Sequence, residues 1–72
     1  MADNLGQLIK IIAHHYNMKA DKINEATKID DLPGDDFDFV ELIVEVETAF
    51  AVKISDKDAS SVIDVGDLLA LL

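Results

Sequence analysis

The most informative stretch of the sequence is LPGDDFDFVEL, residues 32–42. Pro33 and Gly34 form a strong turn signal, and a proline disfavours helical geometry for the residue before it. Directly after this turn, apolar residues recur at the spacing of a helix, which we expect to run from about Asp36 to Ala51. Because an anion is stabilised at a helix N-terminus, Asp36 suits the first helical turn. The stretch therefore predicts the end of a loop and the start of a central helix.

The predicted central helix carries two apolar stripes. One stripe is suited to the core and comprises Phe39, Leu42, Ile43, Val46 and Phe50. The other lies on the opposite side and comprises Phe37, Val40 and Val44, together with Glu41 and flanked by Glu45 and Glu47. A surface helix needs only one apolar stripe. The second stripe packs on another side within a bundle, forms a partner-facing patch with acidic edges, or does both along different turns, and the sequence favours neither reading.

An amphipathic helix is predicted near the N-terminus, from about Asn4 to Tyr16. Asp3 or Asn4 can cap it. The periodicity is then lost through Asn17–Asp35, and long ordered loops in small domains are usually functional or held by apolar anchors. The expected anchors are Met18, Ile23, Ile29 and Leu32.

Two helices are predicted after the central one. Asp56 is expected to cap a short helix that ends at Ser60 or Ser61, and Asp64 a last helix that reaches Leu72. No run of alternating residues predicts a sheet. The fold class is therefore all-α, a small bundle of three main helices plus one short helix.

His14 and His15 stand together at the end of the first predicted helix. His14 lies opposite the apolar face of that helix, and His15 lies on its flank. Adjacent side chains point about 100° apart on a helix, so the two do not form a chelating pair. We interpret both as surface residues and expect no metal site.

Length and composition exclude several classes of function. The chain has 72 residues, so we expect residues 1–72 to form a single domain. Its 15 acidic and 6 basic side chains give a net charge of −9, which argues against nucleic acid and anionic membranes as partners. There is no cysteine for a disulfide or a thiol nucleophile. Without a signal-peptide pattern or a membrane-length apolar run, we expect a cytoplasmic monomer that does not insert into membranes.

Catalytic and calcium-binding motifs are also missing from the sequence. The 3 glycines are isolated, so there is no glycine-rich phosphate loop and no nucleophile elbow. Placing Gly34 at the sixth position of an EF-hand loop puts Ile29 at the first ligand position, which fails the pattern. We therefore expect a non-catalytic protein.

The negative charge is concentrated in one third of the chain. Between Lys28 and Lys53 there is no basic residue, and that segment contains Asp30, Asp31, Asp35, Asp36, Asp38, Glu41, Glu45 and Glu47. A charged face is usually only a solvated face. A one-signed segment of this density favours a docking surface around the central helix and the loop before it.

The same segment resembles the hallmark motif of the acyl carrier proteins, which reads roughly Leu-Gly-Ala-Asp-Ser-Leu-Asp, two residues, then Glu-Leu. Here it reads LPGDDFDFVEL. The similarity extends almost from end to end without gaps. Further matching positions are Thr27, Ile29, Asp31, Leu32, Glu47, Phe50, Ile54, Asp56, Ala59, Val62 and Val65.

This resemblance implies a carrier role. Members of the family hold a 4′-phosphopantetheine arm on a serine at the start of the second helix, and the arm carries acyl chains in fatty-acid, polyketide or related biosynthesis. The implied partners are a phosphopantetheinyl transferase and basic-surfaced synthase or acyltransferase enzymes. The family docks these enzymes through its acidic second helix, and the matching positions here are Asp35, Asp38, Val40, Glu41, Val44 and Glu47.

The chain departs from the family at the attachment position, where Asp36 stands in place of the serine. Attachment needs a hydroxyl that forms a stable phosphodiester, whereas a carboxylate would give an anhydride prone to hydrolysis. We therefore expect no arm on this chain, although phosphopantetheine would be the cofactor if position 36 were serine. Phe37, with Ala59 and Val62, is expected at the mouth of the family's acyl pocket.

Two readings of Asp36 stay open. The serine of a carrier was replaced deliberately, or the chain is a natural relative that has lost the arm. An alternative function, from a different class, is an acidic helical interaction module that binds a basic partner and never carries an acyl group.

Overall fold

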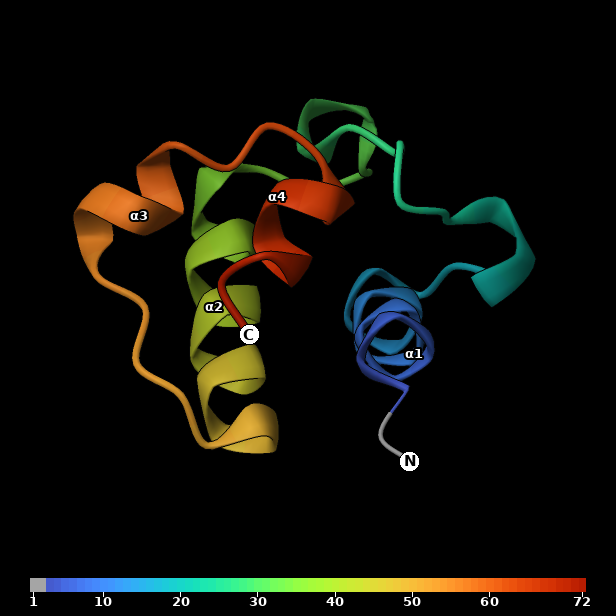
Figure 1. The fold of residues 1–72 in the computed structure, drawn as a ribbon. Coiled ribbons are helices and arrows are strands. Elements are labelled where there is room, and N and C mark those ends of the chain that lie inside the picture. Colours follow the sequence, from blue (N-terminus) through green and yellow to red (C-terminus); the bar gives the residue numbers. More distant parts are fainter. Residues whose placement is uncertain (1–2) are drawn as a thin grey trace.

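The computed structural model describes residues 3–72. All the secondary-structure elements in this part of the chain are helices. The helices are α1 (Asn4–Tyr16), α2 (Asp36–Phe50), α3 (Asp56–Ser60) and α4 (Val65–Leu69), with short 3-10 helices at Ala20–Lys22 and Ile29–Asp31. In Figure 1, α2 stands upright, α1 is seen end-on beside it, and α3 lies on the opposite side. Helix α1 packs against both α2 and α4. The expected all-α class is confirmed.

The core lies where these three helices meet. Each of them contributes two side chains with no exposed surface, and these are Leu8, Ile12, Leu42, Val46, Val65 and Leu68. Burying one such side chain contributes about 1.5–3 kcal/mol before entropic costs. On α2, the buried residues are Leu42, Ile43 and Val46, which belong to the stripe that the sequence assigns to the core. The opposite stripe therefore lies on the outer side of the helix.

Two of the predicted helix caps are confirmed. The Asp3 carboxylate accepts a hydrogen bond from the Gly6 amide at 3.0 Å, at the start of α1. At the start of α4, the Asp67 amide donates to Asp64 at 2.9 Å and the Asp64 amide donates to Asp67 at 3.3 Å. Short acidic side chains therefore satisfy amides that the first turn of a helix leaves without partners.

The predicted cap of α3 is wrong by one residue. Ser55 is the N-cap, and its hydroxyl accepts from the Asp58 amide at 3.1 Å, while Asp56 is the first helical residue. Ser and Asp are both good caps, so neighbouring candidates cannot be separated by residue type. The last helix is also shorter than expected, because after Leu69 the chain tightens into turns, with the Leu72 amide donating to Leu69 at 3.1 Å.

The connection between α1 and α2 is held by backbone hydrogen bonds to the start of α4. The Ile29 amide donates to the Ile63 carbonyl at 2.9 Å, and the Val65 amide donates to Thr27 at 2.9 Å. These bonds explain how a long connection stays ordered and delivers the chain to the first turn of α2. Within residues 3–72, no helix is long and apolar enough to cross a membrane.

Candidate functional site

The first turn of α2 is built by a reciprocal pair of aspartates. The Asp38 amide donates to the Asp35 carboxylate at 3.1 Å, and the Asp35 amide donates to the Asp38 carboxylate at 3.0 Å. This capping box brackets Asp36, which is the first helical residue and is exposed. Residue 36 is therefore presented to solvent by its neighbours and is not needed to form the cap.

Tyr16, at the end of α1, packs closely against this turn. A Cβ atom on Gly34 would lie 2.6 Å from Cε1 of Tyr16 and 2.7 Å from a carboxylate oxygen of Asp38. The absence of a side chain at Gly34 therefore lets the loop pass between the Tyr16 ring and the capping box. Burial raises the pKa of Tyr16, and the carboxylates of Asp38 and Asp35 raise it further.

A cavity of about 500 Å³ opens beside Asp36, between α2 and α3. Its apolar lining comes from Tyr16, Ile29, Phe39, Val40, Ala59 and Val62, and its acidic lining from Asp30, Asp35, Asp36 and Asp56. Ala59 and Val62, which the family resemblance assigns to the mouth of an acyl pocket, both line this cavity. Phe37 does not line the cavity, because its side chain points outward and is 67% exposed.

The second stripe of α2 is an exposed apolar surface. Phe37 is 67% exposed, Val40 58% and Val44 56%, and Glu41 between them is exposed as well. The reading in which this stripe packs inside the bundle is therefore wrong. Because exposed apolar side chains on one helix face mark interaction sites, the stripe is a candidate contact surface. We call Phe37, Val40, Glu41 and Val44 the α2 outer face.

Three of the acidic side chains assigned to docking also have structural contacts. Asp35 and Asp38 form the capping box, and the Glu47 carboxylate accepts a hydrogen bond from the Ile54 amide at 2.8 Å. The Glu47 contact ties the end of α2 to the link that follows it. Glu41 is exposed on the α2 outer face. A substitution there is therefore best suited to test docking without changing the stability of the fold.

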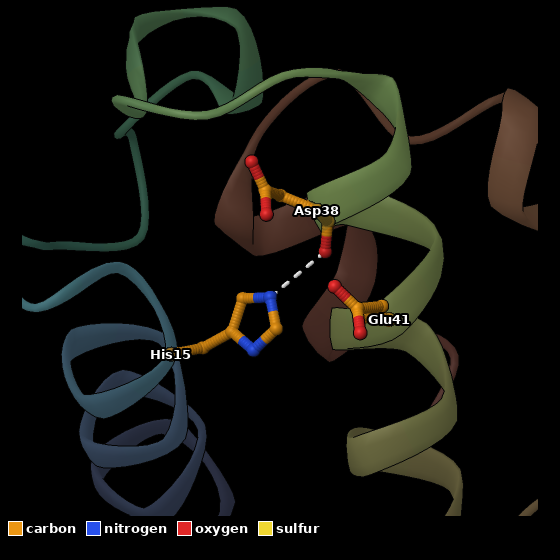
Figure 2. A group of neighbouring side chains, drawn as sticks. All are labelled: His15, Asp38 and Glu41. Atoms are coloured by element: carbon orange, nitrogen blue, oxygen red, sulfur yellow. Dashed lines mark hydrogen bonds between the residues drawn. The ribbon is translucent and has the colours of Figure 1, made fainter.

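The interpretation of His15 as a surface residue is wrong. Its side chain is only 16% exposed, and its ring lies between α1 and α2. Nδ1 lies 3.1 Å from Oε2 of Glu45, and Nε2 lies 2.9 Å from the backbone oxygen of Asp38. Figure 2 shows the ring extending from α1 toward Asp38 and Glu41 on α2. These partners are 23 and 30 residues away in sequence, so the periodicity of α1 carries no signal for the contact.

His15, Asp38 and Glu41 also bring one ring nitrogen and two carboxylates within 4.8 Å of one another (Figure 2). A histidine that binds a metal offers a nitrogen without a proton. Nε2 faces a backbone carbonyl, which only accepts, so this nitrogen carries a proton and donates. Nε2 is therefore engaged in a hydrogen bond to the backbone and is not itself available as a metal ligand.

The chemistry of residue 36 limits what the site can hold. A phosphopantetheine arm is joined through a side-chain hydroxyl, and the side chain at the start of α2 is the carboxylate of Asp36. Asp36 therefore does not fit covalent attachment of that group, although the cavity beside it and the α2 outer face are present.

Comparison with known proteins agrees with this geometry. Residues 6–72 match the model of the phosphopantetheine attachment site family. The structure is also similar to that of an acyl carrier protein from Enterococcus faecalis, with a TM-score of 0.76 and 32% sequence identity over 94% of this chain and 87% of that chain. The chain therefore belongs to the phosphopantetheine attachment site family and has the fold of the acyl carrier proteins, which are non-catalytic carriers.

Proposed function

We propose that this chain is an acyl carrier protein scaffold of fatty-acid or polyketide-type biosynthesis, whose serine-containing form carries acyl chains on a 4′-phosphopantetheine arm. The observation that carries the proposal is the position of residue 36. It is exposed at the start of α2 and lies at the edge of a cavity of about 500 Å³ whose lining is partly apolar and partly acidic. A group attached there would be open to partner enzymes, with the apolar side of this cavity beside it for a chain.

We infer that the chain with Asp36 stays unmodified. A hydroxyl that attacks the phosphorus of coenzyme A leaves a stable phosphodiester, whereas the Asp36 carboxylate would leave a mixed anhydride that water hydrolyses. Its negative charge also opposes the approach of a phosphate. The aspartate is either a deliberate replacement in a carrier or the natural residue of a relative that has lost the arm.

The α2 outer face is the proposed docking surface for a phosphopantetheinyl transferase and for synthase or acyltransferase enzymes with basic surfaces. Its exposed apolar side chains provide contact area, and Glu41 provides charge. Across such an interface, opposite charge steers the encounter while apolar contacts hold the complex. The concentration of acidic residues in 29–52 supports this assignment, because none of the 6 lysines lies in that segment.

A charge reversal at Glu41 tests the docking surface. We would measure binding of a phosphopantetheinyl transferase to the parent chain, to Glu41→Lys and to the control Asp21→Lys, at low and at high salt. Both variants change the net charge equally, but Asp21 lies in the 3-10 helix Ala20–Lys22 and not on α2. Glu41→Lys should weaken binding about tenfold at low salt, and less at high salt. Equal affinities for the two variants would contradict the assignment.

The alternative function is an acidic interaction module that binds a basic partner and never carries an acyl group. The exposed apolar stripe with its acidic neighbour supports this reading as well. It differs from the carrier proposal in one expectation. An interaction module would remain a poor substrate for the transferase after Asp36→Ser, even when that variant is folded.

A further inference from the structure

The α2 outer face is continuous with Asp36 at the start of the helix. Asp36 and Val40 are one helical turn apart, so they are neighbours on the surface of α2. Both residues are exposed, and so is Phe37, which directly follows Asp36. A protein that binds the outer face therefore lies beside residue 36.

The carboxylate of Asp36 is free to face such a protein. The capping box uses the side chains of Asp35 and Asp38, and within residues 3–72 no hydrogen bond or ion pair engages the side chain of Asp36. Its negative charge is therefore presented to a docked enzyme at the position where a carrier presents its hydroxyl. The substitution removes the nucleophile but none of the side chains of the outer face.

No other hydroxyl stands at the start of α2. The one hydroxyl side chain of this helix is Thr48, which donates to the Val44 carbonyl at 3.0 Å and lies about 18 Å along the helix from Asp36. Ser60 lines the cavity beside Asp36, but it belongs to α3 and its hydroxyl donates to the Lys57 carbonyl at 2.8 Å. The chain therefore keeps a surface for docking and lacks a group for loading.

We propose that this chain is a dead-end competitor of serine-containing carriers for phosphopantetheinyl transferases. It binds the enzyme through the α2 outer face and offers a carboxylate where the reaction needs a hydroxyl. The charge of Asp36 also opposes the phosphate of coenzyme A, so the docked complex does not proceed to transfer. The enzyme stays occupied until the chain dissociates. This inference rests on the proposed docking surface and on the carrier assignment.

The aspartate also favours binding of a basic enzyme. Glu41 already gives the α2 outer face a negative charge, and Asp36 adds a second exposed charge of the same sign on the same helix. A basic surface attracts both carboxylates. The parent chain should therefore bind the transferase at least as tightly as Asp36→Ser does, although only the variant can be loaded.

Inhibition of loading by the parent chain tests the proposal. Asp36→Ser is the substrate at varied concentration, with coenzyme A in excess, and intact mass follows the rate at which it gains phosphopantetheine. When the parent is present at about ten times the KM of Asp36→Ser, the apparent KM should rise about tenfold while kcat stays the same. An apparent KM that the parent does not change overturns the proposal.

Two variants of the parent identify the surface that competes. Both change the net charge equally, but Glu41→Lys alters the α2 outer face, whereas Asp21→Lys alters the 3-10 helix Ala20–Lys22. At low salt, Asp21→Lys should inhibit nearly as well as the parent, and Glu41→Lys about tenfold less. Equal inhibition by the two variants overturns the proposal, because the competition would then not come from the outer face.

The same assay separates the competition from the carrier assignment. If Asp36→Ser is folded but gains no phosphopantetheine, both are overturned, because there is then no loading to inhibit. If Asp36→Ser is loaded and the parent does not slow its loading, the carrier assignment stands and the competition alone is overturned. Loading of Asp36→Ser that the parent inhibits by raising KM supports both.

Discussion

The carboxylates of Asp35 and Asp38 each accept a hydrogen bond from the other's backbone amide, at 3.1 Å and 3.0 Å, on either side of Asp36, the position we propose for attachment of an arm. The start of α2 is thereby fixed by residues on either side of Asp36. The capping box does not use the side chain of Asp36. The start of α2 therefore does not require a serine at this position.

The capping box should stabilise the whole domain. Asp35→Ala removes the acceptor of the Asp38 amide, and Asp38→Ala removes the acceptor of the Asp35 amide at the N-cap. We expect each variant to lower the free energy of unfolding by about 1 kcal/mol. The double variant should cost less than the sum, because both bonds belong to one motif. Asp36→Asn is the matched control and should change the free energy by only a few tenths of a kcal/mol. Urea unfolding measures the stability of all four variants. An equal loss of free energy of unfolding for the substitutions at positions 36 and 35 would contradict the stabilising role of the capping box.

Helix α2 ends in a conformation that favours glycine. Ala51 has φ 54° and ψ 45°, in the left-handed region, where an L side chain crowds its own backbone. Ala51→Gly should therefore raise the free energy of unfolding by about 0.5–1 kcal/mol. The same substitution at Ala49, exposed inside α2, should lower it by about 1 kcal/mol. Changes of the same sign at both positions would contradict this assignment of the helix end.

Tyr16 should make the domain sensitive to alkaline pH. Burial, with the nearby carboxylates of Asp38 and Asp35, raises its pKa above the ordinary value of about 10. The folded state therefore holds the phenol proton more tightly than the unfolded state. The resulting stabilisation is complete below pH about 10 and is lost as the pH rises through the folded pKa. Tyr16→Phe should abolish this contribution to the loss of stability at alkaline pH.

The titration of Tyr16 can be followed directly. The chain has 1 tyrosine and no tryptophan, so tyrosinate absorbance reports this residue alone. The native protein should titrate at a higher pH than the same chain unfolded in urea. A native midpoint at or below the unfolded one would contradict the packing of Tyr16 against the first turn of α2.

The helices and most of the core could be predicted from the sequence, because each depends on a local pattern. The stripe of α2 that includes Leu42 and Val46 is buried, and Asp3 and Asp64 cap the helices they precede. Local patterns did not separate Ser55 from Asp56 as a cap, since either residue type performs that role. They also overestimated the length of α4, whose last residues form tighter turns.

The contacts of the site that join distant segments could not be predicted. The ring of His15 meets Glu45 across 30 positions, and Gly34 leaves space for Tyr16, which lies on another element. From the sequence, the outer stripe of α2 could pack within the bundle or face a partner. The positions of α1 and α4 decide between these interpretations. Helix periodicity placed Phe37 on the outer stripe, whereas the family resemblance placed it at a pocket mouth; the structure leaves it 67% exposed and outside the cavity lining.

The most direct test of the carrier assignment is the intact mass of the chain after incubation with coenzyme A and a phosphopantetheinyl transferase. The parent, Asp36→Ser and Asp36→Ala would be treated in parallel, with circular dichroism to verify that each is folded. The account predicts that Asp36→Ser alone gains the mass of one phosphopantetheine group. A folded Asp36→Ser chain that gains no mass, or a parent chain that gains it, would contradict the account.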